Sequence, residues 1–111
     1  MANKVNFDTL RSLAFGDISA TYAAVGTPLD HSARMICITN GTQGGMIFST
    51  DDTNVDGNIF VPAGGSRIYN FTANLIPGKD DNFVVPAGTQ FYVKQTAAPT
   101  SGAVYIEVIY A

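Results

Sequence analysis

The tetrapeptide VPAG occurs at residues 61–64 and again at residues 85–88. Each copy leads into a run rich in aromatic and β-branched residues, SRIYNF at 66–71 and TQFYVKQ at 89–95. Proline presets its own backbone angle for the first corner of a turn, and glycine supplies a corner that other side chains would block. Proline also cannot donate to a strand ladder, so it ends the incoming strand. Each unit is therefore predicted to be a strand, a tight corner and another strand, either as a hairpin or as a corner that crosses between sheets.

Strand-like segments continue on both sides of these two units. They are separated by clusters of Gly, Pro, Asn and Asp, with a turn signal about every 8–12 residues, which is typical of a β-sandwich or barrel. Eight strands are predicted, at 17–25, 33–40, 46–50, 58–61, 66–72, 82–85, 89–96 and 103–110. The fold is therefore expected to be all-β, a single-domain β-sandwich of about eight short antiparallel strands, either Ig-like or jelly-roll-like.

The last predicted strand, 103–110, indicates which face of its sheet is buried. Because side chains alternate along a strand, it has one face with Val104, Ile106, Val108 and Tyr110 and another with Ala103, Tyr105, Glu107 and Ile109. Glu107 identifies the second face as the one exposed to solvent or to a partner.

Residues 1–16 precede the first predicted strand and fit two conformations. The spacing of Phe7, Leu10, Leu13 and Ala14 fits one or two helical turns, whereas the alternation of Leu13, Ala14 and Phe15 fits an extended segment. The extended interpretation is preferred. It divides the chain into an N-terminal arm at 1–16 and a β-sandwich domain at 17–111.

The chain carries few charges. Charged residues make up 14% of it, against roughly 25% in an average soluble domain, and the formal net charge is −3. The basic residues are scattered, with no adjacent pair, so nucleic-acid binding is not expected. A low charge content favours a protein that hides part of its surface against copies of itself or against a partner.

Neither secretion nor membrane insertion is expected. The opening sequence MANKVNFDTL lacks the apolar region of a signal peptide, and no stretch approaches the ~20 apolar residues of a membrane span. Cys37, the one cysteine, lies in the apolar run MICIT and is expected to be a small buried side chain. The protein is therefore expected to be made and to fold inside a cell.

Catalysis is not expected either. His31, the one histidine, stands between Asp30 and Ser32, which are the residue types of a catalytic triad. Neighbours along a chain point in different directions, and triads are recognised by geometry rather than adjacency. The sequence also lacks a nucleophile elbow, a zinc-protease motif and a phosphate-binding loop. The protein is predicted to be no enzyme and to need no cofactor.

One loop resembles part of a calcium site. Asp52, Asn54 and Asp56 alternate ahead of Gly57, as in the first half of a calcium-binding loop. The bidentate Glu expected at the twelfth position is replaced by Ala63. The preferred interpretation is a polar hairpin tip, and Asp52, Asn54 and Asp56 are a weak candidate metal site.

The order of several motifs resembles that of a group of small virion proteins of tailed bacteriophages. The resemblance covers about residues 10–110, and no motif in it is catalytic. The motifs are LRSLAFGDISATYAAVGTPLDHSARMICITNGTQGGMIFSTDD at 10–52, FVPAGGSRIYNFTAN at 60–74, VPAGTQFYVK at 85–94 and PTSGAVYIEVIY at 99–110. The resemblance implies an accessory structural protein that decorates the capsid or forms a ring or collar at the head–tail neck.

The expected function is therefore to assemble or stabilise a phage particle by binding to its head or neck in several copies. The expected partners are other copies of this chain, as a homo-oligomer, and capsid, portal or neck proteins. The expected location is the virion, after synthesis in the host bacterial cytoplasm. The residues expected at the assembly interface are Phe7, Leu10, Leu13 and Phe15 in the arm, and Tyr105 and Ile109 on the last strand. The alternative is a module that binds host-surface glycans, aided by calcium at Asp52–Asp56.

Overall fold

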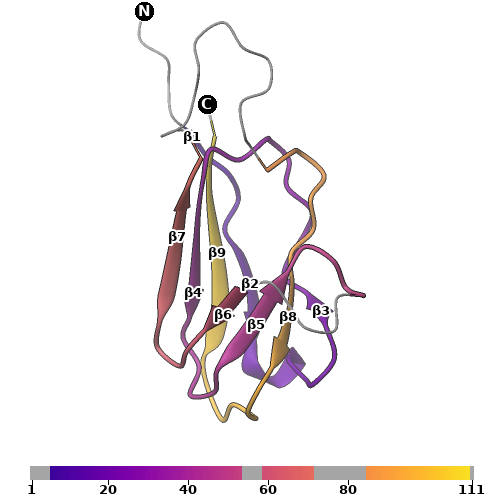
Figure 1. Cartoon of the computed structure of the whole chain (residues 1–111), viewed down its shortest axis with the longest axis vertical. Coiled ribbons are helices and arrows are strands. Elements are labelled where there is room, and N and C mark those ends of the chain that lie inside the picture. Colours follow the sequence, from indigo (N-terminus) through magenta and orange to yellow (C-terminus); the bar gives the residue numbers. More distant parts are fainter. Residues whose placement is uncertain (1–5, 54–58, 72–84, 111) are drawn as a thin grey trace, which may run out of the picture.

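Short strands form two facing sheets that together make a β-sandwich (Figure 1). The computed structural model describes residues 6–53, 59–71 and 85–110. Apart from one 3-10 turn, η1 (Phe15–Asp17), the regular elements of these residues are strands. The all-β sandwich predicted from the turn spacing is therefore confirmed.

Every pairing between the described strands is antiparallel. Sheet A has the order β1-β9-β4-β7, and β2 also pairs with β9. Its strands are β1 (Asn6–Phe7), β2 (Arg11–Ala14), β4 (Met35–Asn40), β7 (Ser66–Asn70) and β9 (Ala103–Tyr110). Sheet B has the order β3-β8-β5-β6. Its strands are β3 (Ala23–Ala24), β5 (Met46–Ser49), β6 (Ile59–Val61) and β8 (Tyr92–Gln95).

The core lies between the two sheets and follows the period of two along each strand. In β9, Val104, Ile106 and Val108 are buried whereas Tyr105 and Glu107 are exposed, as the sequence predicts. Other strands and loops complete the cluster with Ile18, Val25, Leu29, Ala33, Ile36, Ile38, Met46, Phe48, Val61, Phe91 and Val93. Residues from both sheets therefore share one hydrophobic core.

The two VPAG units form the same kind of turn. The N–H of Gly65 donates to the carbonyl of Pro62 at 2.9 Å, and Gly64 has a φ of +72°. In the second unit the N–H of Thr89 donates to Pro86 at 3.3 Å, and Gly88 has a φ of +89°. This turn needs a positive φ at its second corner, and glycine adopts that angle without strain. The glycine therefore determines which residue occupies each position of the turn.

The position of the glycine shows that the proline does not occupy the first corner of the turn, where it was predicted. Alanine occupies the first corner of each turn, and the proline stands one residue earlier, where its carbonyl accepts the closing hydrogen bond. Proline still ends the incoming strand, since β6 stops at Val61.

The two turns differ in what they connect. The first joins β6 of sheet B to β7 of sheet A, so it is a corner that crosses the sandwich (Figure 1). The second lies within a longer antiparallel pairing, since Val85 pairs with Ala33 and Val93 pairs with Ala23 on either side of it. Neither turn closes a simple hairpin between adjacent strands.

Most predicted strands are observed with shorter bounds, but the one predicted at 17–25 is largely wrong. In that range only Ala23–Ala24 is a strand, and Asp17 belongs to η1. The Oγ of Ser19 accepts from the N–H of Thr21 at 3.3 Å, and such local bonds compete with a strand ladder. Of the strand predicted at 82–85, only Val85 lies within the described residues.

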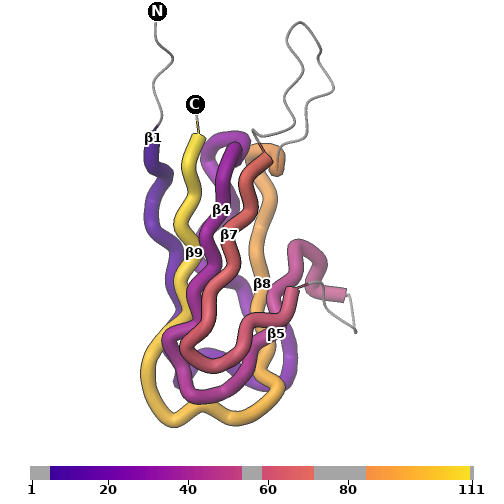
Figure 2. The backbone as a smooth tube through the Cα atoms, turned by 60° about the vertical axis from the view of Figure 1, so that its left-hand side comes forward, coloured from indigo at the N-terminus to yellow at the C-terminus, as the bar shows by residue number. Residues whose placement is uncertain are grey.

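In the described part of the predicted arm, residues 6–14 are extended and Phe15 and Gly16 belong to η1, but this segment does not project from the domain. Phe7 pairs with Ile109 and Arg11 pairs with Ile106, both on β9 (Figure 2). Three residues separate Phe7 from Arg11 where two separate Ile106 from Ile109, so the edge carries a β-bulge. Residues 6–14 are thus the edge of sheet A.

A buried amide holds the crossing corner to the turn between β4 and β5. The Nδ2 of Asn40 donates to the carbonyls of Gly44 at 2.8 Å, Val61 at 3.0 Å and Pro62 at 3.3 Å. Its Oδ1 accepts from the N–H of Thr42 at 3.0 Å and from its hydroxyl at 2.7 Å. Asn40 is fully buried, so the side chain satisfies polar groups that water cannot reach.

Candidate functional site

The outer face of sheet A combines apolar side chains with very few charges. Residues directly opposite each other in a strand pair share a face, so the register defines its members. They are Phe7, Ser12, Ala14, Met35, Cys37, Thr39, Ser66, Ile68, Asn70, Ala103, Tyr105, Glu107 and Ile109. Within this described set, Glu107 is the one acidic or basic residue.

Four of the six predicted interface residues lie on or beside this face. Phe7 is 76% exposed, Leu10 56% and Tyr105 37%. Ile109 is half-buried and stands between Phe7 and Met35 in one row across β1, β9 and β4. The fold thus places Phe7 and Leu10, near the start of the chain, beside Ile109 and Tyr105, near its end.

The other two predicted residues, Leu13 and Phe15, lie elsewhere. Leu13 pairs with the buried Val104 and packs against the core, so its prediction as an arm anchor is corrected. The period of two places it on the inner face, opposite in direction to Ser12. Phe15 is 39% exposed and starts η1, beyond the end of β2.

A shallow groove of about 230 Å³ lies at the bulge in the N-terminal edge. Phe7, Asp8, Leu10, Glu107 and Val108 line it. It joins the exposed side chains of Phe7 and Leu10 to the carboxylate of Glu107 on the outer face. The groove therefore combines apolar side chains with two acidic residues, Asp8 and Glu107, and it can pack against a partner of matching shape.

A buried arginine fastens the N-terminal edge to the sandwich. The Arg11 guanidinium donates to the carbonyls of Thr9 and Thr27, each at 2.7 Å, and to that of Pro28 at 2.8 Å. Its side chain is 1% exposed. A Cβ on Gly26 would stand 2.8 Å from the Arg11 Cγ, so the loop needs glycine at this close approach.

Two acids and the histidine surround this arginine. Asp8 and Asp30 each lie 3.7 Å from its guanidinium, and the Asp8 side chain is 3% exposed. The His31 Nδ1 lies 3.6 Å from the Asp8 Oδ2, and the His31 ring stacks on Tyr110 with 3.7 Å between centroids. The cluster joins the N-terminal edge, the loop before β4 and the end of β9.

Several effects shift the pKa of Asp8. Burial raises it, but the N–H groups of Thr9 and Asp30 and the positive charges of Arg11 and His31 lower it more. The net result is a pKa below the ordinary value of 3.8. Asp8 therefore stays ionised in the folded protein under conditions in which the unfolded chain begins to bind a proton.

We expect Asp8 to make the protein sensitive to acid. Because its pKa is lowered in the folded state, its contribution to the free energy of unfolding is complete above the ordinary pKa and disappears as the pH falls through the folded pKa. Urea unfolding from about pH 7 to about pH 3 should show a shallower loss of stability for Asp8→Asn than for the parent. If the free energy of unfolding of Asp8→Asn and of the parent fell by the same amount over this pH range, Asp8 would not be a source of the acid sensitivity. Asp51→Asn is the comparison at an exposed acid: its pKa is also lowered, by its hydrogen bonds to Thr53, so this variant should make the loss shallower too, but by less than Asp8→Asn.

The side chains of Asp30, His31 and Ser32 have separate partners. His31 faces Asp8 and Tyr110, Asp30 lies near Arg11, and the Ser32 Oγ accepts from the N–H of Ala87 at 3.3 Å. These three residues therefore do not form a triad in this structure.

The weak calcium candidate falls mostly outside the described residues. Asp52 is exposed, whereas Asn54 and Asp56 are not described. Asp51 accepts from the N–H and hydroxyl of Thr53 at 2.9 Å and 2.6 Å, which is the geometry of an Asx turn. In the described part of the chain, no group of three His, Cys, Asp or Glu side chains is placed to hold a metal. Calcium-assisted glycan binding remains a prediction.

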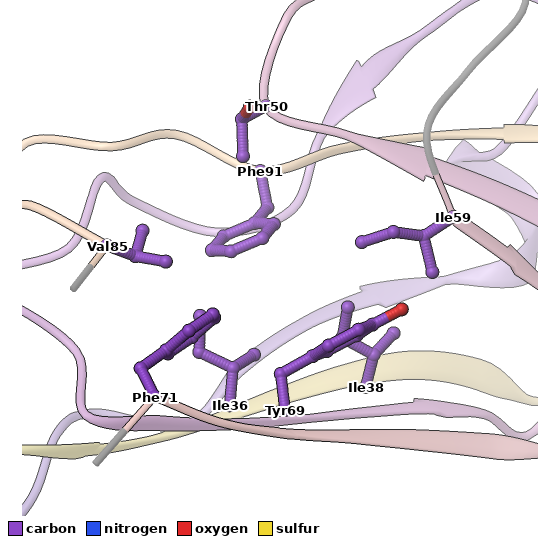
Figure 3. A pocket seen from close by; sticks show the side chains of 8 residues that line it. All are labelled: Ile36, Ile38, Thr50, Ile59, Tyr69, Phe71, Val85 and Phe91. Atoms are coloured by element: carbon purple, nitrogen blue, oxygen red, sulfur yellow. The ribbon is translucent and has the colours of Figure 1, made fainter. Parts of the chain in front are cut away.

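A second, apolar cavity of about 320 Å³ lies between the sheets. Figure 3 shows Ile36, Ile38, Tyr69 and Phe71 on one side and Thr50, Ile59, Val85 and Phe91 on the other. Its lining carries no charged group, and its polar side chains are those of Thr50 and Tyr69. It opens to the surface beside Thr50, and its lining has no group for acid–base or metal chemistry.

Sequence reasoning missed several residues of these surfaces. Cys37 is half-buried on the outer face, so its predicted burial is corrected. Ile68 is 66% exposed, and the alternation of SRIYNF would have separated it from Tyr69 and Phe71. Asp8 and Arg11 carried no sequence signal, because their partners come from distant loops.

In the described residues, no helix has the length and apolar character to cross a bilayer. Comparisons with models of protein families, with curated proteins and with solved structures find no match to this chain.

Proposed function

We propose that this protein is a structural component of a tailed-phage virion and binds in several copies to the head or the head–tail neck. The observation that carries the proposal is the clustering of exposed Phe7, Leu10 and Tyr105 on and beside the nearly uncharged outer face of sheet A. The order of sequence motifs supports the phage assignment. The contact to the particle would be made by this face.

Burying these apolar side chains against a partner would be energetically favourable. Moving a Phe, Leu or Tyr side chain out of water contributes about 1.5–3 kcal/mol when its burial is complete. Phe7 and Leu10 stand close together at the groove, so one partner surface can cover both. Several copies on a symmetric particle multiply this modest contribution, as in other multivalent contacts.

Rigidity also supports the proposal. Arg11 holds the N-terminal edge through its hydrogen bonds to Thr9, Thr27 and Pro28, and it lies close to both Phe7 and Leu10 along the chain. An interface residue that is already fixed loses less conformational entropy when it binds. The pairing of β1 and β2 with β9 thus presents the apolar side chains in a fixed arrangement.

The proposal predicts that the double variant Phe7→Ser, Leu10→Ser is lost from particles. The experiment uses a phage genome that carries this gene, with the gene deleted and each variant supplied in trans. The amount of the chain in purified particles should fall at least about tenfold, since losing more than about 1.4 kcal/mol per contact lowers affinity by that factor.

The matched control is Phe60→Ser. Phe60 is 50% exposed, but it lies on β6 of sheet B. This variant should be incorporated like the parent. Equal incorporation of the double variant, or absence of the parent chain from particles, would contradict the proposed function. Urea unfolding of each purified variant shows whether a loss arises from misfolding.

A further inference from the structure

Among the described residues of the outer face of sheet A, Glu107 is the one acidic or basic side chain, and it lines the groove beside the N-terminal edge. It is exposed on β9, whereas its neighbours along the strand, Ile106 and Val108, are buried. Within the described part of the chain, its carboxylate takes part in no ion pair and no side-chain hydrogen bond. The carboxylate is therefore available to a partner.

The other acid of the groove, Asp8, is already compensated inside the protein. Its side chain is 3% exposed and lies 3.7 Å from the Arg11 guanidinium. Its Oδ1 also accepts from the N–H of Thr9 at 2.7 Å. The Arg11 side chain is 1% exposed and donates to three backbone carbonyls, so its charge stays inside the fold. Glu107 therefore gives the open surface of the groove its charge.

A partner that covers the apolar side chains of the groove also covers Glu107. Phe7, Leu10 and Glu107 line the same groove of about 230 Å³, so a surface that fills it reaches all three. Phe7 is 76% exposed and Leu10 56%, and covering them is the favourable part of such a contact. A carboxylate that loses its water without gaining a donor is costly, and a basic side chain supplies the strongest donors. The groove thus favours a partner that brings a cation.

We propose that the groove takes a segment of another protein of the particle, in which an apolar side chain is accompanied by an arginine or a lysine. In this contact the apolar side chain lies between Phe7 and Leu10, and the basic group pairs with Glu107. The inference deepens the proposed function and rests on it, because it names the chemistry of the head or neck surface that this face meets.

A second copy of this chain fits the groove less well. In a symmetric contact the same patch meets itself. The described residues of the outer face include Glu107 but no Lys or Arg, so two carboxylates would approach each other with no cation between them. Like charges across an interface oppose association. The charge of the groove therefore favours a different chain as its occupant.

The test measures the binding of the purified full chain to phage particles that were assembled without it. Glu107→Gln should weaken this binding about tenfold, because it removes the ion pair and keeps the shape of the side chain. Glu107→Lys should weaken it at least about a hundredfold, since a like charge then faces the basic group. Raising the salt concentration from about 0.05 M to about 0.5 M should weaken binding of the parent more than that of Glu107→Gln.

Asp52→Lys is the matched control, because it makes the same change of net charge as Glu107→Lys at an exposed position in the loop after β5. It should bind like the parent. Glu107 is exposed, so its variants should keep the parental circular dichroism and urea unfolding curve. Binding of Glu107→Lys that equals that of the parent would overturn the basic partner and leave the proposed function intact. The same salt dependence in the parent and in Glu107→Gln would also overturn it.

Two further outcomes distinguish this inference from the proposed function. If the parent does not bind to particles, the proposed function fails, and the inference that rests on it fails as well. Sedimentation equilibrium tests the second copy as occupant. If the parent forms a dimer that Glu107→Lys dissociates, the basic group comes from another copy of this chain, and the assignment to a different protein is overturned.

Discussion

Asn40→Asp is expected to lower the free energy of unfolding by about 3–5 kcal/mol. The side chain is fully buried, and its Nδ2 donates to the carbonyls of Gly44, Val61 and Pro62. Aspartate has nearly the same shape but presents an oxygen to all three carbonyls. The result is either a buried charge that faces three carbonyl oxygens or a protonated acid with a single hydrogen to donate to them, and both leave polar groups unsatisfied.

Guanidinium unfolding at neutral pH measures this loss. The control is Asn6→Asp, which makes the same change at an exposed position on the N-terminal edge. It should change the free energy of unfolding by less than about 0.5 kcal/mol. If Asn40→Asp were as stable as this control, the buried amide would not be what holds the crossing corner.

Arg11→Ala is expected to cause a loss of similar size, about 3–5 kcal/mol. The substitution leaves the carbonyls of Thr9, Thr27 and Pro28 without their donor. It also leaves the Asp8 carboxylate, whose side chain is 3% exposed, without the permanent positive charge of the guanidinium 3.7 Å away. Breaking a buried charge pair from one side costs more than the pair contributes net, because the remaining charge stays buried.

Thermal and urea unfolding test this expectation, with Arg67→Ala as the matched control at an exposed arginine. Arg11→Lys should recover part of the loss at best, since an ammonium cannot reproduce the planar fork that reaches three carbonyls. The acid sensitivity assigned to Asp8 should also change in Arg11→Ala, because one of the charges that lower its pKa is gone. An unchanged stability would show that the N-terminal edge does not depend on this arginine.

The elements best predicted from the sequence were those governed by local patterns. The alternation of 103–110 gave the correct buried and exposed faces of β9. The strand expected at 17–25 failed because a hydroxyl at Ser19 bonds the adjacent backbone, which alternation does not reveal. The predicted position of the proline was wrong because the glycine, with its positive φ, determines which residue occupies each position of the turn.

The predicted interface residues also show what a local pattern can and cannot determine. Phe7 and Leu10 were chosen for their apolar character and are exposed in the structure, while their place at an interface stays a prediction. Leu13 has the same character, but its register opposite Val104 turns it into the core. A single step along a strand decides between the two faces, so only the pairing partner can distinguish an anchor from a core residue.

The sequence by itself determined the all-β class and the inner face of the last strand, because turn chemistry and a period of two are properties of neighbouring residues. Only the tertiary structure decided that residues 6–14 form an edge of sheet A, that Asp8 meets Arg11 and His31, and that Ile68 is exposed on the outer face of sheet A. Each of these depends on residues far apart in the chain. Their contacts arise when strands pair and loops pack, and no local pattern encodes which distant partner a side chain will meet.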